Sequence, residues 1–156
     1  MAVSLKSERP FLSLSASDIS ETALETAALN ASRLLLRNTA VQFIKSDLFE
    51  SISGRFRIIV SNPPYIPTEK IDILAPELQR EPRIALDGGE GGLELIKKII
   101  PSSLKHLNTR GVLLLEADPQ QMPEILRLLS ANNFCEPRIY NDLAGLARVV
   151  SVRLLN

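Results

Sequence analysis

The sequence predicts an α/β fold in which a mostly parallel sheet is covered by helices. Short apolar runs of strand type alternate along the chain with stretches whose apolar residues recur at helical spacing, which is typical of such sheets. The length of 156 residues and a hydrophobic content of 45% suit one compact domain with a buried core. We therefore expect a single domain over residues 1–156.

The first part of the chain predicts two strands around one helix, followed by a third strand. Residues 11–16 alternate apolar and polar side chains and end close to Asp18, as a half-buried strand does. Residues 20–37 carry alanine and leucine at helical spacing and predict an amphipathic helix. Apolar runs at residues 41–45 and 57–60 predict the next two strands.

Residues 62–91 differ from the rest of the chain, because they hold five of the ten prolines and three of the seven glycines. Only residues 71–78 have a short helical pattern. A long connection at the carboxyl end of a strand is where α/β sheets usually place a ligand site. The glycines at residues 88–92 leave two interpretations open, a cradle for an anion or a flexible turn that begins the next helix.

The remaining elements complete the α/β pattern. Residues 92–107 carry apolar side chains on one helical face. A buried strand is predicted at residues 111–116 and another helix at residues 119–132. Residues 138–140 and 148–155 are predicted to form a closing antiparallel strand pair.

Charge and composition exclude several classes of protein. Eighteen basic side chains balance eighteen acidic ones, so the chain does not have the charge of a protein that binds nucleic acid mainly by neutralising phosphates. A single cysteine, Cys135, excludes an internal disulfide framework and a cysteine zinc cluster. The apolar runs are too short to span a bilayer and the first residues lack the apolar region of a signal peptide, so we expect a cytoplasmic protein.

The sharpest local signal is Asn62-Pro63-Pro64-Tyr65, which directly follows a predicted strand; we call these four residues the acceptor corner. Two successive prolines fix their φ angles and have no N–H group. The Asn62 side-chain oxygen and the Pro63 carbonyl can therefore accept hydrogen bonds from one planar NH2 group, beside the aromatic ring of Tyr65. A strand-ending polyproline turn without a ligand is the alternative interpretation.

The acceptor corner resembles the catalytic motif of the amino-group methyltransferases, which use S-adenosylmethionine. Residues 81–93 and 142–148 resemble the HemK-type protein-(glutamine-N5) methyltransferases, which modify peptide-chain release factors. The resemblance runs over the whole chain. It implies a Rossmann-like class I S-adenosylmethionine-dependent methyltransferase fold. It also implies methyl transfer to a glutamine side chain of a protein, with a release factor, free or on the ribosome, as the partner.

The resemblance also assigns cofactor-binding residues. Asp18 would accept hydrogen bonds from the ribose hydroxyls, and Asp47 would accept one from the adenine amino group. Leu48 or Phe49 would pack against the adenine ring. From the residues alone, Asp18 could equally cap the following helix, Asp47 could simply end a strand, and Phe49 could lie in the core.

The same resemblance makes Asn62 and Pro63 the catalytic residues, with Asn62 also next to the cofactor. Their oxygens would hold both hydrogens of the substrate amide and direct its nitrogen lone pair at the methyl group of the sulfonium. Pro64, Tyr65 and Glu81 would complete the substrate site, although Glu81 could also be a surface carboxylate. No metal is expected.

One part of the family pattern is not found in these 156 residues. Members carry a first strand with a glycine-rich loop, and a helical domain before it, whereas residues 2–10 resemble the helix after that loop. The first strand is central in the family order, 3-2-1-4-5-7-6. We therefore expect the strands at residues 11–16 and 41–45 to lack a continuous partner to those at 57–60 and 111–116, and this chain alone to bind the cofactor weakly or not at all.

Two other functions share these features. Methyltransferases that modify nucleic-acid amino groups, adenine N6 or cytosine N4, use the same four-residue motif. Such enzymes must also bind a phosphate backbone, and the neutral net charge of this chain does not favour that binding. The other alternative is a non-catalytic remnant of the fold, or an inactive fragment.

Overall fold

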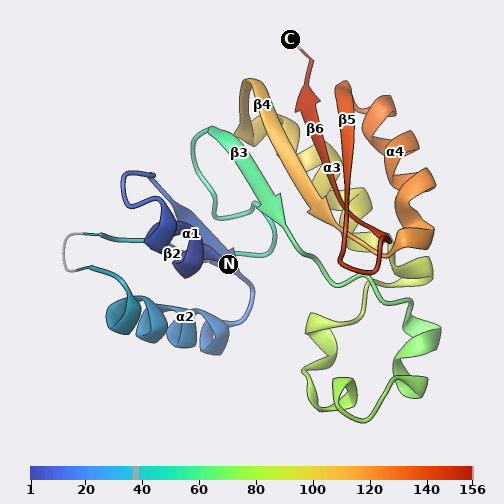
Figure 1. Cartoon of the computed structure of the whole chain (residues 1–156), viewed down its shortest axis with the longest axis horizontal. Coiled ribbons are helices and arrows are strands. Elements are labelled where there is room, and N and C mark those ends of the chain that lie inside the picture. The colour runs from blue at the N-terminus through green and yellow to red at the C-terminus, as the bar shows by residue number, and fades with distance from the viewer. Residues whose placement is uncertain (37–38, 156) are drawn as a thin grey trace. The chain divides into compact units, whose positions relative to one another are not determined.

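The computed structural model describes residues 1–36 and 39–155. The chain divides into two compact units, Met1–Ser53 and Gly54–Asn156, and each unit has its own β-sheet (Figure 1).

The first unit is a small α/β arrangement around two parallel strands. Its elements are α1 (Ala2–Glu8), β1 (Ser15–Asp18), α2 (Glu21–Leu34) and β2 (Gln42–Lys45). The register runs from Ser15 opposite Gln42 to Asp18 opposite Lys45. Because the two strands are parallel, the residues that follow Asp18 and Lys45 leave the same edge of this sheet.

The first strand begins later than its sequence pattern predicts. Residues 9–12 close a turn after α1, in which the N–H of Leu12 donates to the carbonyl of Arg9 at 3.1 Å. The buried Lys6 ammonium donates to the Leu12 carbonyl at 2.6 Å, and the Phe11 side chain is exposed. This turn occupies the start of the predicted strand, so that only Ser15–Asp18 pair with β2.

Helix α2 confirms the predicted amphipathic helix but ends at Leu34. It begins at the cap residue Ser20, whose hydroxyl accepts from the N–H of Ala23 at 3.3 Å. Leu35 has an extended backbone, which ends the helix. The predicted end at Arg37 lies outside the described residues.

The second unit holds a four-stranded sheet with two helices. Its regular elements are β3 (Phe56–Ser61), α3 (Glu94–His106), β4 (Leu107–Glu116), α4 (Met122–Ala131), β5 (Phe134–Asn141) and β6 (Ala147–Leu154). The strand order is β3-β4-β6-β5. Strands β3 and β4 are parallel, whereas β6 runs antiparallel to both β4 and β5. The predicted closing antiparallel pair is therefore confirmed.

The core of this unit lies between the sheet and helices α3 and α4. Alternate residues of β4, Leu113 and Leu115, are completely buried, while their neighbour Leu114 is half-buried. The helices contribute further fully buried apolar side chains, among them Ile96, Ile100, Ile125 and Leu129. Burying each such side chain contributes about 1.5–3 kcal/mol, which anchors the elements that carry the site.

The structure confirms that the strands do not form one continuous sheet. Within the described residues, β1 pairs only with β2, and the outer edge of β3 has no partner strand. The order β2-β1 within the first unit and the order β3-β4-β6-β5 within the second each agree with the corresponding part of the expected family order. The side chains of Ile58 and Val60 on β3 are 59% and 43% exposed, which is unusual for a parallel strand.

The long connection between β3 and α3 forms a lobe beyond the carboxyl ends of β3 and β4 (Figure 1). A short helix was expected at residues 71–78. The connection instead contains four 3-10 helices: Thr68–Ile73, Leu78–Arg80, Arg83–Ala85 and Glu90–Gly92. Five prolines in this segment interrupt the longer hydrogen-bond runs that an α-helix needs.

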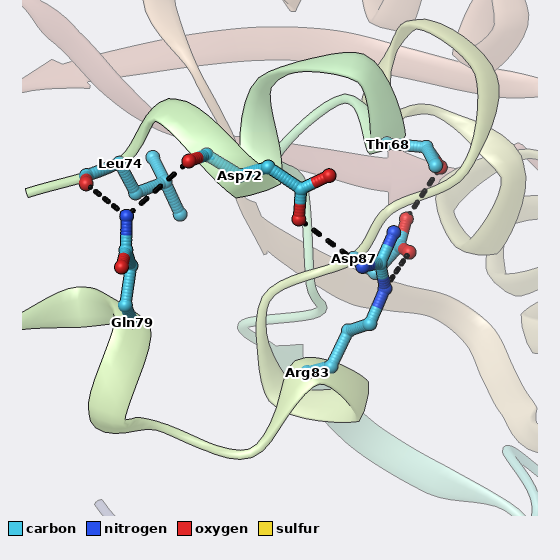
Figure 2. Close-up of polar contacts among 6 residues, drawn as sticks. All are labelled: Thr68, Asp72, Leu74, Gln79, Arg83 and Asp87. Carbon is cyan, nitrogen blue, oxygen red and sulfur yellow. Dashed lines mark hydrogen bonds and ion pairs between the residues drawn. The ribbon is translucent and has the colours of Figure 1, made fainter.

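Polar side chains hold the lobe together (Figure 2). The Thr68 hydroxyl donates to Asp87 Oδ1 at 2.6 Å, and Arg83 lies 3.2 Å from Asp87 Oδ2 and 3.5 Å from Asp72 Oδ1. The Gln79 amide donates to the carbonyls of Asp72 and Leu74. No helix in the described part of the chain is long and apolar enough to cross a membrane.

Candidate functional site

The acceptor corner lies at the edge of the sheet where β3 and β4 both end. Ser61 is opposite Leu115 in the parallel register, so that Asn62 and Asp118 follow the two strands at the same edge. Strand β6 runs the other way and begins there, and the N–H of Ala117 donates to the Arg148 carbonyl at 3.0 Å. Carboxyl ends of parallel strands are the usual location of ligand sites in α/β sheets.

The two predicted acceptors of the corner have different environments. Pro63 is buried, whereas Asn62 is exposed. Among residues 1–36 and 39–155, no group donates a hydrogen bond to the Asn62 side-chain oxygen or to the Pro63 carbonyl. The corner therefore has one buried and one exposed residue, and two oxygens that accept no hydrogen bond from the residues that the structure describes.

Tyr65 lies half-buried between groups of opposite charge. Burial, and then the negative charge of Glu116, raise the pKa of its phenol, while the neighbouring Arg148 guanidinium lowers it in part. The net pKa is above the ordinary value, so the phenol is neutral at physiological pH. Tyr65 can thus offer an uncharged aromatic surface beside the acceptors.

Arg148 is itself held by the turn between β5 and β6. Its Nη2 and Nε atoms lie 3.2 and 3.4 Å from Asp142 Oδ2. The other oxygen of Asp142 accepts from the N–H groups of Ala144 and Leu146. The Leu146 hydrogen bond, more than the Arg148 contact, lowers the pKa of Asp142 and keeps it ionised. These residues belong to the 142–148 segment on which the sequence resemblance rests, and the structure brings the segment to Tyr65.

The glycine segment at residues 88–92 lies against the corner. Four of its N–H groups donate to acceptors of the protein: Gly88 to the Ile66 carbonyl, Gly89 to Asp87 Oδ1, Glu90 to Glu94 Oε1 and Gly92 to the Gly89 carbonyl. A cradle for an anion needs free N–H groups, and here carboxylates already accept from two of them, those of Gly89 and Glu90. These hydrogen bonds favour a turn before α3 over an anion cradle.

Gln121 is a residue of the site that sequence reasoning missed. Its side chain is buried and donates at 2.9 Å both to the Tyr65 carbonyl and to the Gly91 carbonyl. The available signal was a capping box beginning at Asp118, whose glutamine accepts from the Asp118 N–H. A capping box explains one of the three hydrogen bonds of this amide, but not the two that reach distant segments.

Glu81, predicted to line the substrate entrance, ends the second 3-10 helix of the lobe and is exposed. No hydrogen bond or ion pair joins its carboxylate to any residue that the structure describes. Its role at the substrate entrance stays a prediction.

The predicted cofactor residues lie together at one edge of the first unit. Asp18 ends β1, is exposed, and accepts from the Ser20 N–H at 2.8 Å. The cap of α2 is Ser20, so the alternative of Asp18 as the helix cap is wrong. Because β1 and β2 are parallel, the turn after Lys45 leaves the same edge.

That turn, residues 46–52, is tight and strained. Leu48 has a φ of 46°, which is rare for a bulky side chain. The carbonyls of Asp47 and Phe49 accept from the N–H groups of Glu50 and Ile52 at 3.0 Å each. Asp47 is exposed, and Leu48 and Phe49 are half-buried. An exposed carboxylate next to partly buried apolar side chains fits the edge and face of an adenine ring.

No cluster of metal-ligating side chains occurs in the described part of the chain.

The fold is similar to that of solved methyltransferases. It resembles a methyltransferase from Pyrococcus furiosus with a TM-score of 0.70 at 18% identity, over 98% of this chain and 68% of that chain. A ribosomal protein L11 methylase from Lactobacillus delbrueckii gives a TM-score of 0.63 at 23% identity, over 92% of this chain and 58% of the other. The family model of the methyltransferase small domain matches residues 1–89, and the chain belongs to this family.

The chain is also similar in sequence to proteins that are named as glutamine methyltransferases. A release factor glutamine methyltransferase of Geobacter sulfurreducens is 36% identical over 99% of this chain and 54% of its own length, and one of Agrobacterium fabrum is 40% identical over 88% and 47%. A ribosomal protein uL3 glutamine methyltransferase of Neisseria meningitidis is 37% identical over 74% and 38%. These names agree with the resemblance found in the sequence. The chain spans about half the length of the relatives that it matches.

Proposed function

We propose that this chain supplies the catalytic part of a protein-glutamine methyltransferase. The enzyme transfers a methyl group from S-adenosylmethionine to the side-chain amide nitrogen of a glutamine, and a peptide-chain release factor is the proposed substrate. The observation that carries this proposal is a pair of acceptors without a donor among the described residues, the Asn62 side-chain oxygen and the Pro63 carbonyl, at the edge of the sheet where β3 and β4 end.

The chemistry requires an oriented amide. An amide nitrogen is a weak nucleophile, because its lone pair is delocalised into its carbonyl group. Two fixed acceptors can hold both N–H hydrogens and direct the lone pair out of the amide plane, and orientation of this kind can lower a barrier by roughly 7–11 kcal/mol in favourable cases. The same oxygens stabilise positive charge that develops on the nitrogen, so no general base is needed before transfer.

S-Adenosylmethionine would supply the electrophilic methyl group. The residues of the first unit fit its adenosine half: Asp18 can accept from ribose hydroxyls, Asp47 from an adenine amino group, and Leu48 and Phe49 can contact the ring. Asn62 is proposed to border the cofactor as well as the substrate. Pro64, Tyr65 and Glu81 are proposed to contact the acceptor protein, with Tyr65 as a neutral aromatic surface.

A release factor is preferred to other acceptors because relatives named for release factors match more of this chain. Four of them cover 88–99% of it, whereas four relatives named for ribosomal protein uL3 cover 74–86%. Release factors act in translation, so we propose a cytoplasmic enzyme, with the substrate free or on the ribosome. We also propose that residues 1–156 belong to one catalytic domain. The neutral charge does not favour a nucleic-acid substrate.

Mass spectrometry tests this proposal directly. The full-length protein that contains this chain is incubated with S-adenosylmethionine and a purified release factor, and the intact mass of the factor is measured. We expect the mass to rise by one methyl group, and peptide mapping to place it on a glutamine. Replacement of that glutamine by asparagine in the factor is the control. Ribosomal protein uL3 is tested as a second acceptor. If neither a release factor nor uL3 is methylated, the proposal is contradicted.

A further inference from the structure

We propose that Gln121, Gly88 and Gly92 are positioning residues that hold the acceptor corner from behind. This inference rests on the proposed function, because it assigns a role in setting the geometry of Asn62 and Pro63. We call these three residues the backing clamp.

The Gln121 side chain joins three separate segments. It is 7% exposed, and its NH2 group donates to the Tyr65 carbonyl after β3 and to the Gly91 carbonyl before α3, at 2.9 Å each. Its oxygen accepts from the Asp118 N–H after β4 at 3.1 Å. The orientation of the amide is fixed by its partners, because a flipped amide would place its oxygen against two carbonyl oxygens.

The two glycines allow backbone to contact backbone. A Cβ atom on Gly92 would overlap the Tyr65 carbonyl and the Gln121 amide. A Cβ on Gly88 would lie 2.8 Å from both the Pro64 carbonyl oxygen and the Tyr65 Cα. Any larger residue at either position would therefore displace the second half of the corner or the Gln121 side chain.

The clamp fixes the corner from one side and β3 fixes it from the other. Ser61 is held in the parallel ladder with β4, and Tyr65 is held by Gln121 and the glycines. Between these points Pro63 and Pro64 have fixed φ angles, so few backbone rotations remain that could move the Pro63 carbonyl or Asn62. A misplacement of about 1 Å at a reacting group can reduce a rate by roughly 10²-fold.

The test compares Gly92→Ala with Gly54→Ala in the full-length protein. Both glycines have a positive φ, 72° and 86°, so alanine is strained at both, but a Cβ at Gly54 meets nothing within 4 Å. Gln121→Met is the second variant, because methionine keeps the shape of glutamine without its hydrogen bonds. We measure kcat for release-factor methylation, the KM for the factor and cofactor affinity. We also measure hydrogen exchange at the amide of Ile66, which directly follows Tyr65 and donates to the Leu86 carbonyl at 3.0 Å.

We expect Gly92→Ala and Gln121→Met to lower kcat by roughly 10²-fold and to speed exchange at Ile66, with cofactor affinity near that of the unmodified protein. Gly54→Ala should show neither change. An unchanged kcat in Gln121→Met, or an equal loss in Gly54→Ala, would overturn the inference. Loss of cofactor affinity together with kcat in Gln121→Met would show a general structural role and overturn it too.

Failure of the proposed function gives a different pattern. If the unmodified protein methylates no release factor, the proposed activity is wrong. Hydrogen exchange at Ile66 still tests whether the backing clamp holds the acceptor corner. Faster exchange in Gly92→Ala and Gln121→Met than in Gly54→Ala would support it, and equal exchange in all three would refute it.

Discussion

The carboxylate of Asp142 pairs with the guanidinium of Arg148, with Oδ2 and Nη2 3.2 Å apart, and this pair sets Arg148 beside Tyr65. Both side chains are less than a third exposed. The turn between β5 and β6 is thereby connected to the acceptor corner, although the two are separated by almost half of the chain.

Replacing Arg148 tests this connection through the ionisation of Tyr65. Arg148 lowers the pKa of the phenol, against burial and Glu116, which raise it. Arg148→Ala should therefore raise the pKa of Tyr65 further. Ultraviolet titration in a Tyr140→Phe background measures this, since the chain has only two tyrosines. Arg127→Ala, which removes an ion pair to Glu124 on α4, is the control. A constant or lower pKa in Arg148→Ala would show that the two groups do not interact.

The proposed roles of Asn62 and Asp18 predict opposite kinetic defects in the full-length enzyme. Asn62→Ala should lower kcat by at least about 10²-fold, because one preorganised acceptor is lost, and leave cofactor affinity nearly unchanged. Asp18→Ala should weaken cofactor binding first. Calorimetry and steady-state kinetics separate the two effects, with the exposed Asn30 on α2 replaced by alanine as a control. Near-normal turnover in Asn62→Ala would remove Asn62 from the mechanism.

The lobe should lose stability in acid through Asp87. A hydrogen bond from Thr68, then one from the Gly89 N–H, and the contact with Arg83 lower the pKa of this carboxyl below 3.8. A carboxyl whose pKa is lower in the folded protein than in the unfolded chain stabilises the fold at any pH above its unfolded-state pKa. This stabilisation is lost as the pH falls through the folded-state pKa. Thr68→Val should therefore be less stable than the unmodified protein at neutral pH.

The difference between Thr68→Val and the unmodified protein should shrink as the pH falls below the folded pKa of Asp87. Urea unfolding at neutral and acidic pH measures it. Thr109→Val, at an exposed position of β4 whose hydroxyl makes no hydrogen bond to any described residue, is the matched control. A pH-independent difference would mean that Thr68 acts by packing alone.

The separation of the two sheets predicts weak cofactor binding by residues 1–156 alone. Neither β1 nor β3 has a second strand neighbour among the described residues, and unpaired backbone groups at such an edge are costly to bury, at about 1–3 kcal/mol each. Titration calorimetry with S-adenosylmethionine should give an affinity weaker than micromolar, or no heat. Micromolar binding would contradict this expectation.

Local sequence patterns predicted most elements correctly, because hydrophobic periodicity depends on near neighbours. The helices at residues 20–37 and 92–107 and the antiparallel pair at the end were found in this way, with errors of a few residues at their ends. The first strand was misplaced because Lys6, five residues before the predicted start, closes a turn with the Leu12 carbonyl.

The sequence by itself determined the local backbone of the corner, because two successive prolines have fixed φ angles and no N–H group that could donate to the neighbouring oxygens. Only the tertiary structure decided what holds that corner. Gln121 reaches Tyr65 across 56 residues, and Gly92 is a glycine because the Tyr65 carbonyl occupies the space of its side chain. Such contacts join segments that are distant along the chain, and no periodic pattern records them.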